Sequence, residues 1–214
     1  LSFRAVRVLK DVDLIAAEDT RYSKRLLNHY DIKTPAISYY DAVEADKADE
    51  VINKLNEGLN VALISNAGTP TISDPGYRVI RKALQNGFSV VSVPGTSAHT
   101  AALSVSGLPT DRFIFEGFVP RKAGEKRRAF EALRDEPRTV IFYESPHRIE
   151  KTLDTLADLF PEREVCICRE LTKIYEEVIK GTAREVAETV KRRKPIKGEI
   201  TIIIAGEKKR KPKE

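Results

Sequence analysis

The sequence predicts an α/β protein with two domains, a mostly parallel sheet with flanking helices in the first half and a mixed sheet with helices in the second. Short apolar runs alternate with helical patterns along the 214 residues, which is typical of parallel sheets covered by helices. Hydrophobic residues make up 41% of the chain, enough for real cores and too many for a disordered protein. Prolines and glycines between 107 and 120 mark a boundary. We therefore expect domains at 1–117 and 118–206, followed by a disordered basic tail at 207–214.

The first half begins with a helical pattern, so we expect a strand and its loop to precede it in the natural protein. The elements that follow are predicted from apolar periodicity, capping residues and glycine stops. They are a strand at 13–17, a helix at 20–30 capped by Asp19 or Thr20, a strand at 36–39, and a helix at 43–56 that stops at Gly58.

The stretch 61–77, VALISNAGTPTISDPGY, is the most informative part of the chain. It predicts a buried strand, a loop rich in Gly and Pro, and the start of a helix. A second unit of the same kind follows, with a strand at 89–93 (SVVSV), the loop Pro94–Ala98 and a helix of small residues. Ligands bind at the carboxyl ends of strands in open α/β sheets, and glycine lets a ligand lie against bare backbone. The two loops therefore predict a ligand site.

The second half is predicted to form another α/β unit with more antiparallel character. Its expected elements are a strand at 113–115, a basic helix from 120 to about 134, a strand at 139–143, a helix at 149–160, strands at 164–169 and 175–180, a helix at 183–193 and a strand at 199–205.

The net charge of +5 is unevenly distributed. Residues 1–117 carry 13 basic and 14 acidic side chains, whereas residues 118–214 carry 24 basic and 18 acidic ones. The excess gathers in Lys126–Arg128, Lys191–Lys197 (KRRKPIK) and Lys208–Lys213 (KKRKPK). This distribution suggests a small ligand for the first half and a polyanion for the second. Solvated helix ends and a flexible tail would give the same charge, so charge alone leaves both interpretations open.

Cysteines, histidines and hydropathy exclude several classes of protein. Cys166 and Cys168 lie on one face of a predicted strand and are interpreted as reduced core residues. The three histidines show no metal-ligand spacing. No apolar run approaches the roughly 20 residues that span a bilayer, so we expect a cytoplasmic protein that does not bind membranes.

Eight sequence blocks occur in a specific order over nearly the whole chain. They are EDTR at 18–21; AGTP at 67–70 with SDPG at 73–76; Pro94-Gly95 with Ser97-Ala98; GLP at 107–109; FEGF at 115–118; FYESPHR at 142–148; RELTK at 169–173; and Gly198-Glu199. In this order they resemble the tetrapyrrole methylase superfamily, and within it the branch that methylates the ribose 2′-oxygen of a cytidine in small-subunit (16S) ribosomal RNA. Each block alone is a weak signal, but eight in order are specific.

The chain departs from the family pattern at three places besides its beginning. Asn66 stands where the family often has Asp, and Thr96 where it often has Pro. Tyr40–Val43 replaces a segment in which the family commonly shows His and Asn. This last change argues against a role for the segment in handling substrate.

The resemblance implies a tetrapyrrole methylase-like fold that binds S-adenosylmethionine (SAM) in the cleft between two domains, without a metal. Backbone groups of the loops would pair with the adenine and the carboxylate of this cofactor. The implied cofactor-binding residues are Asn66, Ala67, Gly68, Thr69, Pro70, Ser97, Ala98, Tyr143, Leu171, Glu199 and Ile200.

The expected chemistry sets what the catalytic residues must do. A sulfonium methyl group is already activated, so the enzyme mainly aligns donor and acceptor and excludes water. A ribose hydroxyl is a poor nucleophile and is helped by a nearby base. Glu144 and Lys173 are the candidates for this role, followed by Glu170 and His147. A helix-capping role for Glu144 or Ser145 is the alternative.

The expected partners are small-subunit ribosomal RNA, within the assembled ribosomal particle, and a second copy of the chain in a homodimer. Phosphates would be contacted by basic residues of the second half. These are Arg121, Lys122, Arg127, Arg128 and the KRRK run at 191–194. Two alternatives remain open at this point: a methyltransferase of the same fold that acts on a tetrapyrrole such as a precorrin, and a non-catalytic RNA-binding assembly factor.

Overall fold

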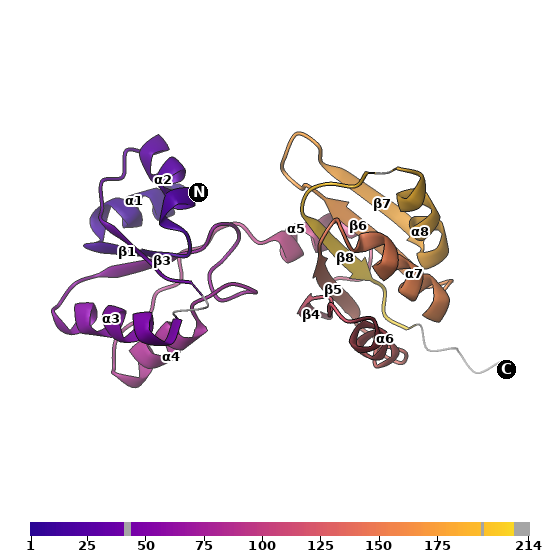
Figure 1. Cartoon of the computed structure of the whole chain (residues 1–214), viewed down its shortest axis with the longest axis horizontal. Coiled ribbons are helices and arrows are strands. Elements are labelled where there is room, and N and C mark those ends of the chain that lie inside the picture. Colours follow the sequence, from indigo (N-terminus) through magenta and orange to yellow (C-terminus); the bar gives the residue numbers. More distant parts are fainter. Residues whose placement is uncertain (41–43, 194, 208–214) are drawn as a thin grey trace. The chain divides into compact units, whose positions relative to one another are not determined.

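The computed structural model describes residues 1–40, 44–193 and 195–207, which form two compact units, Leu1–Ser97 and Ala98–Glu214 (Figure 1). Three expectations fall wholly or partly outside the described residues: those on Asp41–Val43, on Lys194 in the KRRK run, and on the tail at 208–214.

The first unit is built on a parallel sheet with helices on both faces, as predicted, and within the described residues this sheet has three strands. Strand β1 (Leu14–Ala17) lies between β2 (Ala36–Ser38) and β3 (Val61–Ile64) and pairs in parallel with both. Its described helices are α1 (Phe3–Asp11), α2 (Thr20–His29), α3 (Glu44–Asn56) and α4 (Tyr77–Gln85).

Strand β1 is buried on both faces, which explains why all four of its residues are apolar. Ile15 and Ala17 pack with Leu9 of α1 and Leu27 of α2. Ala16 points the other way, into a cluster with residues of α3 and α4. Figure 1 shows the two helix pairs on opposite sides of the sheet.

The start of α2 resolves the choice between two capping residues. Asp19 is the N-cap, because its carboxylate accepts hydrogen bonds from the backbone N–H groups of Arg21 and Tyr22. These contacts lower the pKa of Asp19. Thr20 is the first helical residue.

The predicted strand at 89–93 is wrong. These residues form neither helix nor strand, and Val91 is 66% exposed. Their β-branched composition is typical of a strand, but a strand also needs a neighbour that completes its hydrogen bonds. Within the described residues the sheet has three strands, and none of them pairs with this segment.

The second unit is built on a five-stranded mixed sheet, as predicted, in the order β4-β5-β8-β6-β7. Strands β4 and β5 are parallel, and the remaining pairs are antiparallel. The strands are β4 (Phe113–Phe118), β5 (Thr139–Glu144), β6 (Glu164–Arg169), β7 (Glu177–Thr182) and β8 (Ile200–Ile204). The helices are α5 (Ala98–Ser106), α6 (Ala123–Glu131), α7 (Ile149–Leu159) and α8 (Ala183–Arg192).

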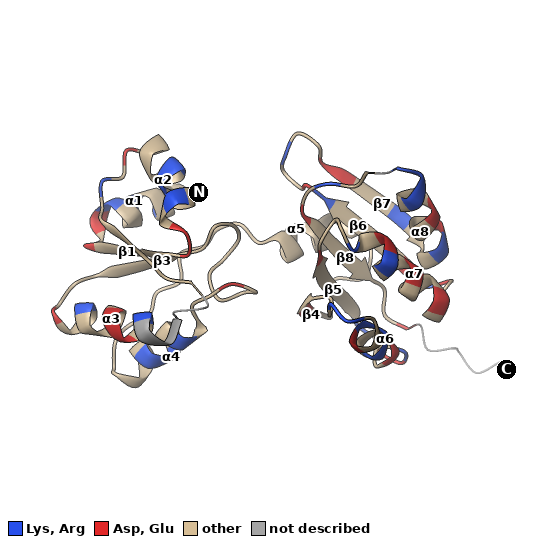
Figure 2. Cartoon of the chain, viewed as in Figure 1, with Lys and Arg blue, Asp and Glu red and all other residues tan. Residues whose placement is uncertain are grey.

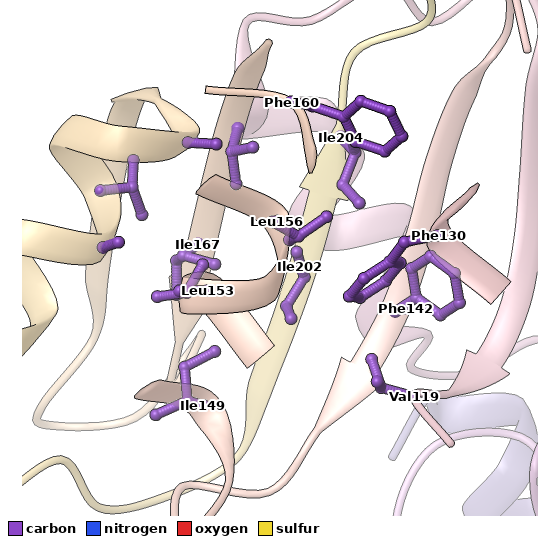
Figure 3. Close-up of a cluster of buried hydrophobic side chains, with 14 of the residues drawn as sticks. Val119, Phe130, Phe142, Ile149, Leu153, Leu156, Phe160, Ile167, Ile202 and Ile204 are labelled. Atoms are coloured by element: carbon purple, nitrogen blue, oxygen red, sulfur yellow. The ribbon is translucent and has the colours of Figure 1, made fainter. Parts of the chain in front are cut away.

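Helices α6, α7 and α8 cover one face of this sheet, and α5 covers the other. The larger core joins side chains of the first three helices to alternate residues of β5, β6 and β8, with Phe130 against Phe142 at 5.6 Å between ring centroids (Figure 3). The smaller core packs α5 against the opposite face and contains Cys166 and Cys168, which are free and buried, as expected.

The division between the units lies about twenty residues before the expected boundary at 117/118. Helix α5 contacts β5, β6 and β8, so it lies with the second sheet, and β4 pairs with β5 in that sheet. Gly107, Pro109 and Pro120 lie between elements of the second unit, and Gly117 lies within β4.

Candidate functional site

The loop after β3 is held by the first of the eight sequence blocks, EDTR. Glu18 follows β1 and accepts a hydrogen bond from the backbone N–H of Asn66 at 2.9 Å, while its own N–H donates to Ile64 O at 3.1 Å. Thr69 Oγ1 in turn donates to the carbonyl oxygen of Thr96 at 3.0 Å. The two predicted loops therefore lie together, although the second is not preceded by a strand.

This loop has features that fit a bound ligand. Asn66 Oδ1 is buried and accepts no hydrogen bond from the described part of the chain, although such an acceptor costs about 1–3 kcal/mol when unpaired. Ala67 and Gly68 are exposed. Thr71 and Ser73 have φ angles of 76° and 63°, and such strained backbone clusters at ligand sites. The loop therefore places a buried oxygen that accepts no hydrogen bond beside exposed backbone. This arrangement suits a ligand that carries N–H donors.

The second loop leads directly into a helix, as predicted. Ser97 is the last residue of the first unit, and Ala98 is the first residue of α5. Helix N-termini carry unpaired N–H groups that favour anions, although the N–H of His99 already donates to Tyr143 Oη at 3.3 Å.

Tyr143 belongs to an aromatic cluster on the α5 face of the second sheet. Its ring contacts those of Phe115 and Phe118, and His99 stacks on Phe115 at 4.7 Å with an interplanar angle of 21°. Tyr143 Oη lies 3.2 Å from His99 Nδ1. Burial lowers the pKa of His99, which favours the neutral imidazole.

Glu144 points to the opposite face of the sheet from Tyr143, because successive residues of a strand alternate. Its side chain is fully buried and paired with Arg148 at 2.5 Å. It also accepts hydrogen bonds from Thr152 Oγ1 and from the N–H of Ser145, both at 2.6 Å. Lys126 lies behind this group, 3.4 Å from Thr152 Oγ1. Burial lowers the pKa of Lys126, and the carboxylate of Glu144 opposes that effect.

Lys173 lies in an acidic cluster formed by the RELTK block and the start of β8. Its Nζ pairs with Glu170 at 2.8 Å and with Glu199 at 3.0 Å. The hydrogen bond to Glu170 raises the pKa of Lys173, so the amine stays protonated. Glu170 Oε1 also accepts from the N–H of Glu199 at 2.9 Å, and a Cβ on Gly198 would collide with its carboxyl group. Only glycine suits this position, where φ is +95°.

The structure therefore brings the predicted residues into separate groups. Asn66, Ala67, Gly68, Thr69 and Pro70 share the loop after β3. Tyr143 and Leu171 lie on the α5 face of the second sheet, whereas Ile200 packs in the larger core, on the same side as Glu144. His147 is exposed and donates its N–H to Ser145 Oγ.

Sequence reasoning did not single out Glu18, His99, Phe118 or Arg148. Glu18 and Phe118 stand inside the quoted blocks EDTR and FEGF, and Arg148 ends FYESPHR. Their order along the chain was visible, but their contacts depend on which face of the sheet each side chain takes.

Among the residues that the structure describes, no group of three or more His, Cys, Asp or Glu side chains is arranged to hold a metal ion. None of the helices in these ranges is both long and apolar enough to cross a membrane.

Known proteins are similar in sequence to this chain over almost its full length. A protein of Halalkalibacterium halodurans called ribosomal RNA small subunit methyltransferase I is 47% identical over 206 residues, which cover 96% of this chain and 71% of that protein. A protein of the same name from Thermotoga maritima is 42% identical over 206 residues, 96% of this chain and 92% of that protein.

Solved structures share the fold at low sequence identity. The methyltransferase CobJ has a TM-score of 0.68 at 18% identity and aligns with 96% of this chain and 88% of its own. Diphthine synthase has a TM-score of 0.69 at 13% identity, over 96% of this chain and 84% of its own. The sequence model of the family described as Tetrapyrrole (Corrin/Porphyrin) Methylases matches residues 1–187. The chain thus belongs to the tetrapyrrole methylase family of methyltransferases.

Proposed function

We propose that the protein is a SAM-dependent methyltransferase that modifies the ribose 2′-oxygen of a cytidine in small-subunit ribosomal RNA. The observation that carries this proposal is the identity of 42–47% across 96% of the chain to proteins named for small-subunit ribosomal RNA methylation. The excess of basic residues in the second half supports it, because the phosphate backbone of RNA is a polyanion that pairs with Lys and Arg.

The loop after β3 would hold part of the cofactor. Asn66 Oδ1 would accept a hydrogen bond from an N–H group of SAM, and the exposed peptides of Ala67 and Gly68 would pair with its polar edges. Thr69 and Pro70 would shape this loop, since Thr69 links it to Thr96. When bound, SAM supplies a methyl group already activated by the sulfonium.

Ser97, the last residue of the first unit, and residues of the second unit would contribute the remaining cofactor contacts. Ser97 and Ala98 lie at the start of α5, where N–H groups favour the carboxylate. The implied set is completed by Tyr143, Leu171, Glu199 and Ile200. Leu171 packs against the smaller core and offers an apolar wall.

Glu144 and Lys173 remain the candidates for the base. Their contacts bear on which of them could accept a proton. A base must accept a proton, whereas Lys173 has a raised pKa and already donates to two carboxylates. Lys173 therefore fits better as a cation that orders Glu170 and Glu199. Glu144 is an acceptor, but Arg148, Thr152 and a backbone N–H occupy it.

The test is methyl transfer from labelled SAM to small ribosomal subunits isolated from cells that lack the enzyme. We expect label in the RNA, and resistance to alkali of the bond that follows the labelled nucleotide, because alkaline cleavage requires a free 2′-hydroxyl. Label without this resistance would indicate methylation of a base and would contradict the 2′-oxygen assignment.

A calorimetric titration with SAM separates the remaining alternatives. Binding of RNA without heat from SAM would support a non-catalytic assembly factor. Methyl transfer to a precorrin in place of RNA would support the tetrapyrrole alternative.

We also propose that the enzyme is a cytoplasmic homodimer that acts on the assembled ribosomal particle. Analytical ultracentrifugation measures the mass of the protein and so tests the dimer. A comparison of methyl transfer to naked RNA and to small subunits tests whether the particle is needed.

A further inference from the structure

A bulge in β4 brings two phenylalanines to the same side of the sheet. Phe115 pairs with Ile141 and Phe118 with Tyr143, so three steps along β4 match two along β5. In a regular strand, residues three apart face opposite sides. The extra residue of the bulge reverses this, and Gly117 has the positive φ of +72° that such a bulge takes.

The bulge places both rings against Tyr143. The ring centroids of Phe115 and Phe118 lie 4.8 and 5.5 Å from that of Tyr143. His99 stacks on the far ring, Phe115. We call these four residues the aromatic cluster. Phe118 is its outermost member, with 56% of the residue exposed.

The backbone after Phe118 is fixed in spite of this exposure. Val119 N–H donates to Tyr143 O at 3.1 Å, and Arg148 Nη1 donates to Val119 O at 3.1 Å. Arg148 is held in turn by the buried carboxylate of Glu144. An exposed ring on a fixed backbone loses little conformational entropy when it binds a flat partner.

Positive charge follows directly along the chain. Arg121 lies three residues after Phe118, and α6 carries Arg127 and Arg128 (Figure 2). Arg127 pairs with Glu131. Arg121 and Arg128 are exposed and make no ion pair with a residue that the structure describes.

We propose that the aromatic cluster stacks an unpaired base of the RNA substrate on Phe118, while Arg121, three residues further along the chain, contacts a neighbouring phosphate. This inference rests on the proposed function and names the part of the RNA that the second unit recognises. Unpaired bases stack on aromatic side chains in RNA recognition, and phosphates pair with arginine. The adenine of SAM is a poorer match, because SAM carries no phosphate for Arg121.

The test uses the full chain and a short single-stranded RNA that contains 2-aminopurine, whose fluorescence is quenched by stacking. We expect quenching by the wild type and a loss of RNA affinity of about 5- to 150-fold in Phe118→Ala, since stacking contributes roughly 1–3 kcal/mol per base. Phe118→Tyr should restore binding and Phe118→Leu should not, because leucine fills space without a π face.

Phe113→Ala is the matched control. Phe113 lies on the same strand, and it is also exposed, but it pairs with Thr139 at the other end of β4. This variant should bind RNA like the wild type. Arg121→Gln should reduce the magnitude of the negative slope of log K against log salt by about 0.7, the value for one contact to a single strand.

Three results would overturn the inference. The first is the absence of quenching by the wild type, and the second is equal RNA affinity in Phe118→Ala and Phe113→Ala. The third is weaker SAM binding by calorimetry in Phe118→Ala with RNA affinity unchanged, which would assign the ring to the cofactor. Failure of the proposed function is distinct from all three, since it appears as a wild type that transfers no methyl group to subunits.

Discussion

Replacement of Glu144 by Gln should destabilise the second unit more than it alters chemistry. The substitution keeps the shape of the side chain but removes the charge of a carboxylate that is fully buried, pairs with Arg148 and accepts two hydrogen bonds. It leaves Lys126, only 7% exposed, without its neighbouring anion. Arg148 loses the same partner, although 26% of its side chain reaches solvent.

The magnitude follows from these contacts. Breaking a buried ion pair by removing one partner costs about 3–5 kcal/mol. Because Arg148 can turn toward water and Lys126 can lose its proton, we expect the lower end, about 3 kcal/mol. With a urea dependence of roughly 2 kcal/mol per molar, the unfolding midpoint should fall by about 1.5 M.

Urea unfolding followed by circular dichroism measures this change, and hydrogen exchange locates it to β5 and α7. Glu125→Gln is the control, because Glu125 forms an exposed pair with Lys122 and such pairs contribute about 0–1 kcal/mol. A Glu144→Gln protein that unfolds at the wild-type midpoint, but transfers methyl groups at least roughly 100-fold more slowly, would refute this reasoning and identify Glu144 as the base.

Three further predictions concern other sites. Gly198→Ala should destabilise the protein by at least about 2 kcal/mol in urea unfolding, because φ is +95° and the new Cβ meets Glu170; an unchanged midpoint would contradict this. The bonds from Arg138 lower the pKa of Glu136 from 4.5 to about 2, so this pair stabilises the fold above pH 4.5 and the stabilisation is lost toward pH 2. The midpoint deficit of Glu136→Gln should accordingly vanish over that range, and a deficit independent of pH would exclude the ionic contribution. Asn66→Ala should unfold at an equal or higher midpoint and bind SAM roughly tenfold more weakly by calorimetry, because it removes an unpaired buried acceptor; undiminished affinity would separate Asn66 from the cofactor.

Much of the fold could be predicted from the sequence because its signals are local. Apolar runs, glycine stops and the Asp19 cap placed most helices and strands within a few residues of their observed bounds. The strand predicted at 89–93 was wrong because composition indicates a strand but does not show whether a neighbouring strand is present to pair with it. The expected boundary at 117/118 placed α5 with the first half for a related reason. The packing of α5 on the second sheet is a contact between residues far apart in sequence, which local patterns do not reveal.

The candidate site was harder to predict because it depends on strand faces. Tyr143 and Glu144 are adjacent, and sequence order alone placed both at one strand end. Glu144 shares its face with Phe142, two residues earlier, so alternation with a core residue indicated burial. The isolated glycine in FEGF was a similar signal, since a glycine within a strand often marks a bulge.

The position of β8 has a consequence for how the protein is made. This strand is the last described one in sequence, yet it lies at the centre of its sheet, between β5 and β6. During synthesis the β4-β5 and β6-β7 pairs must wait, each with an open edge, until residues 200–204 leave the ribosome. Nascent chains that stall earlier would expose two apolar edges to other chains. The second sheet can therefore be completed only after β8 has been synthesised.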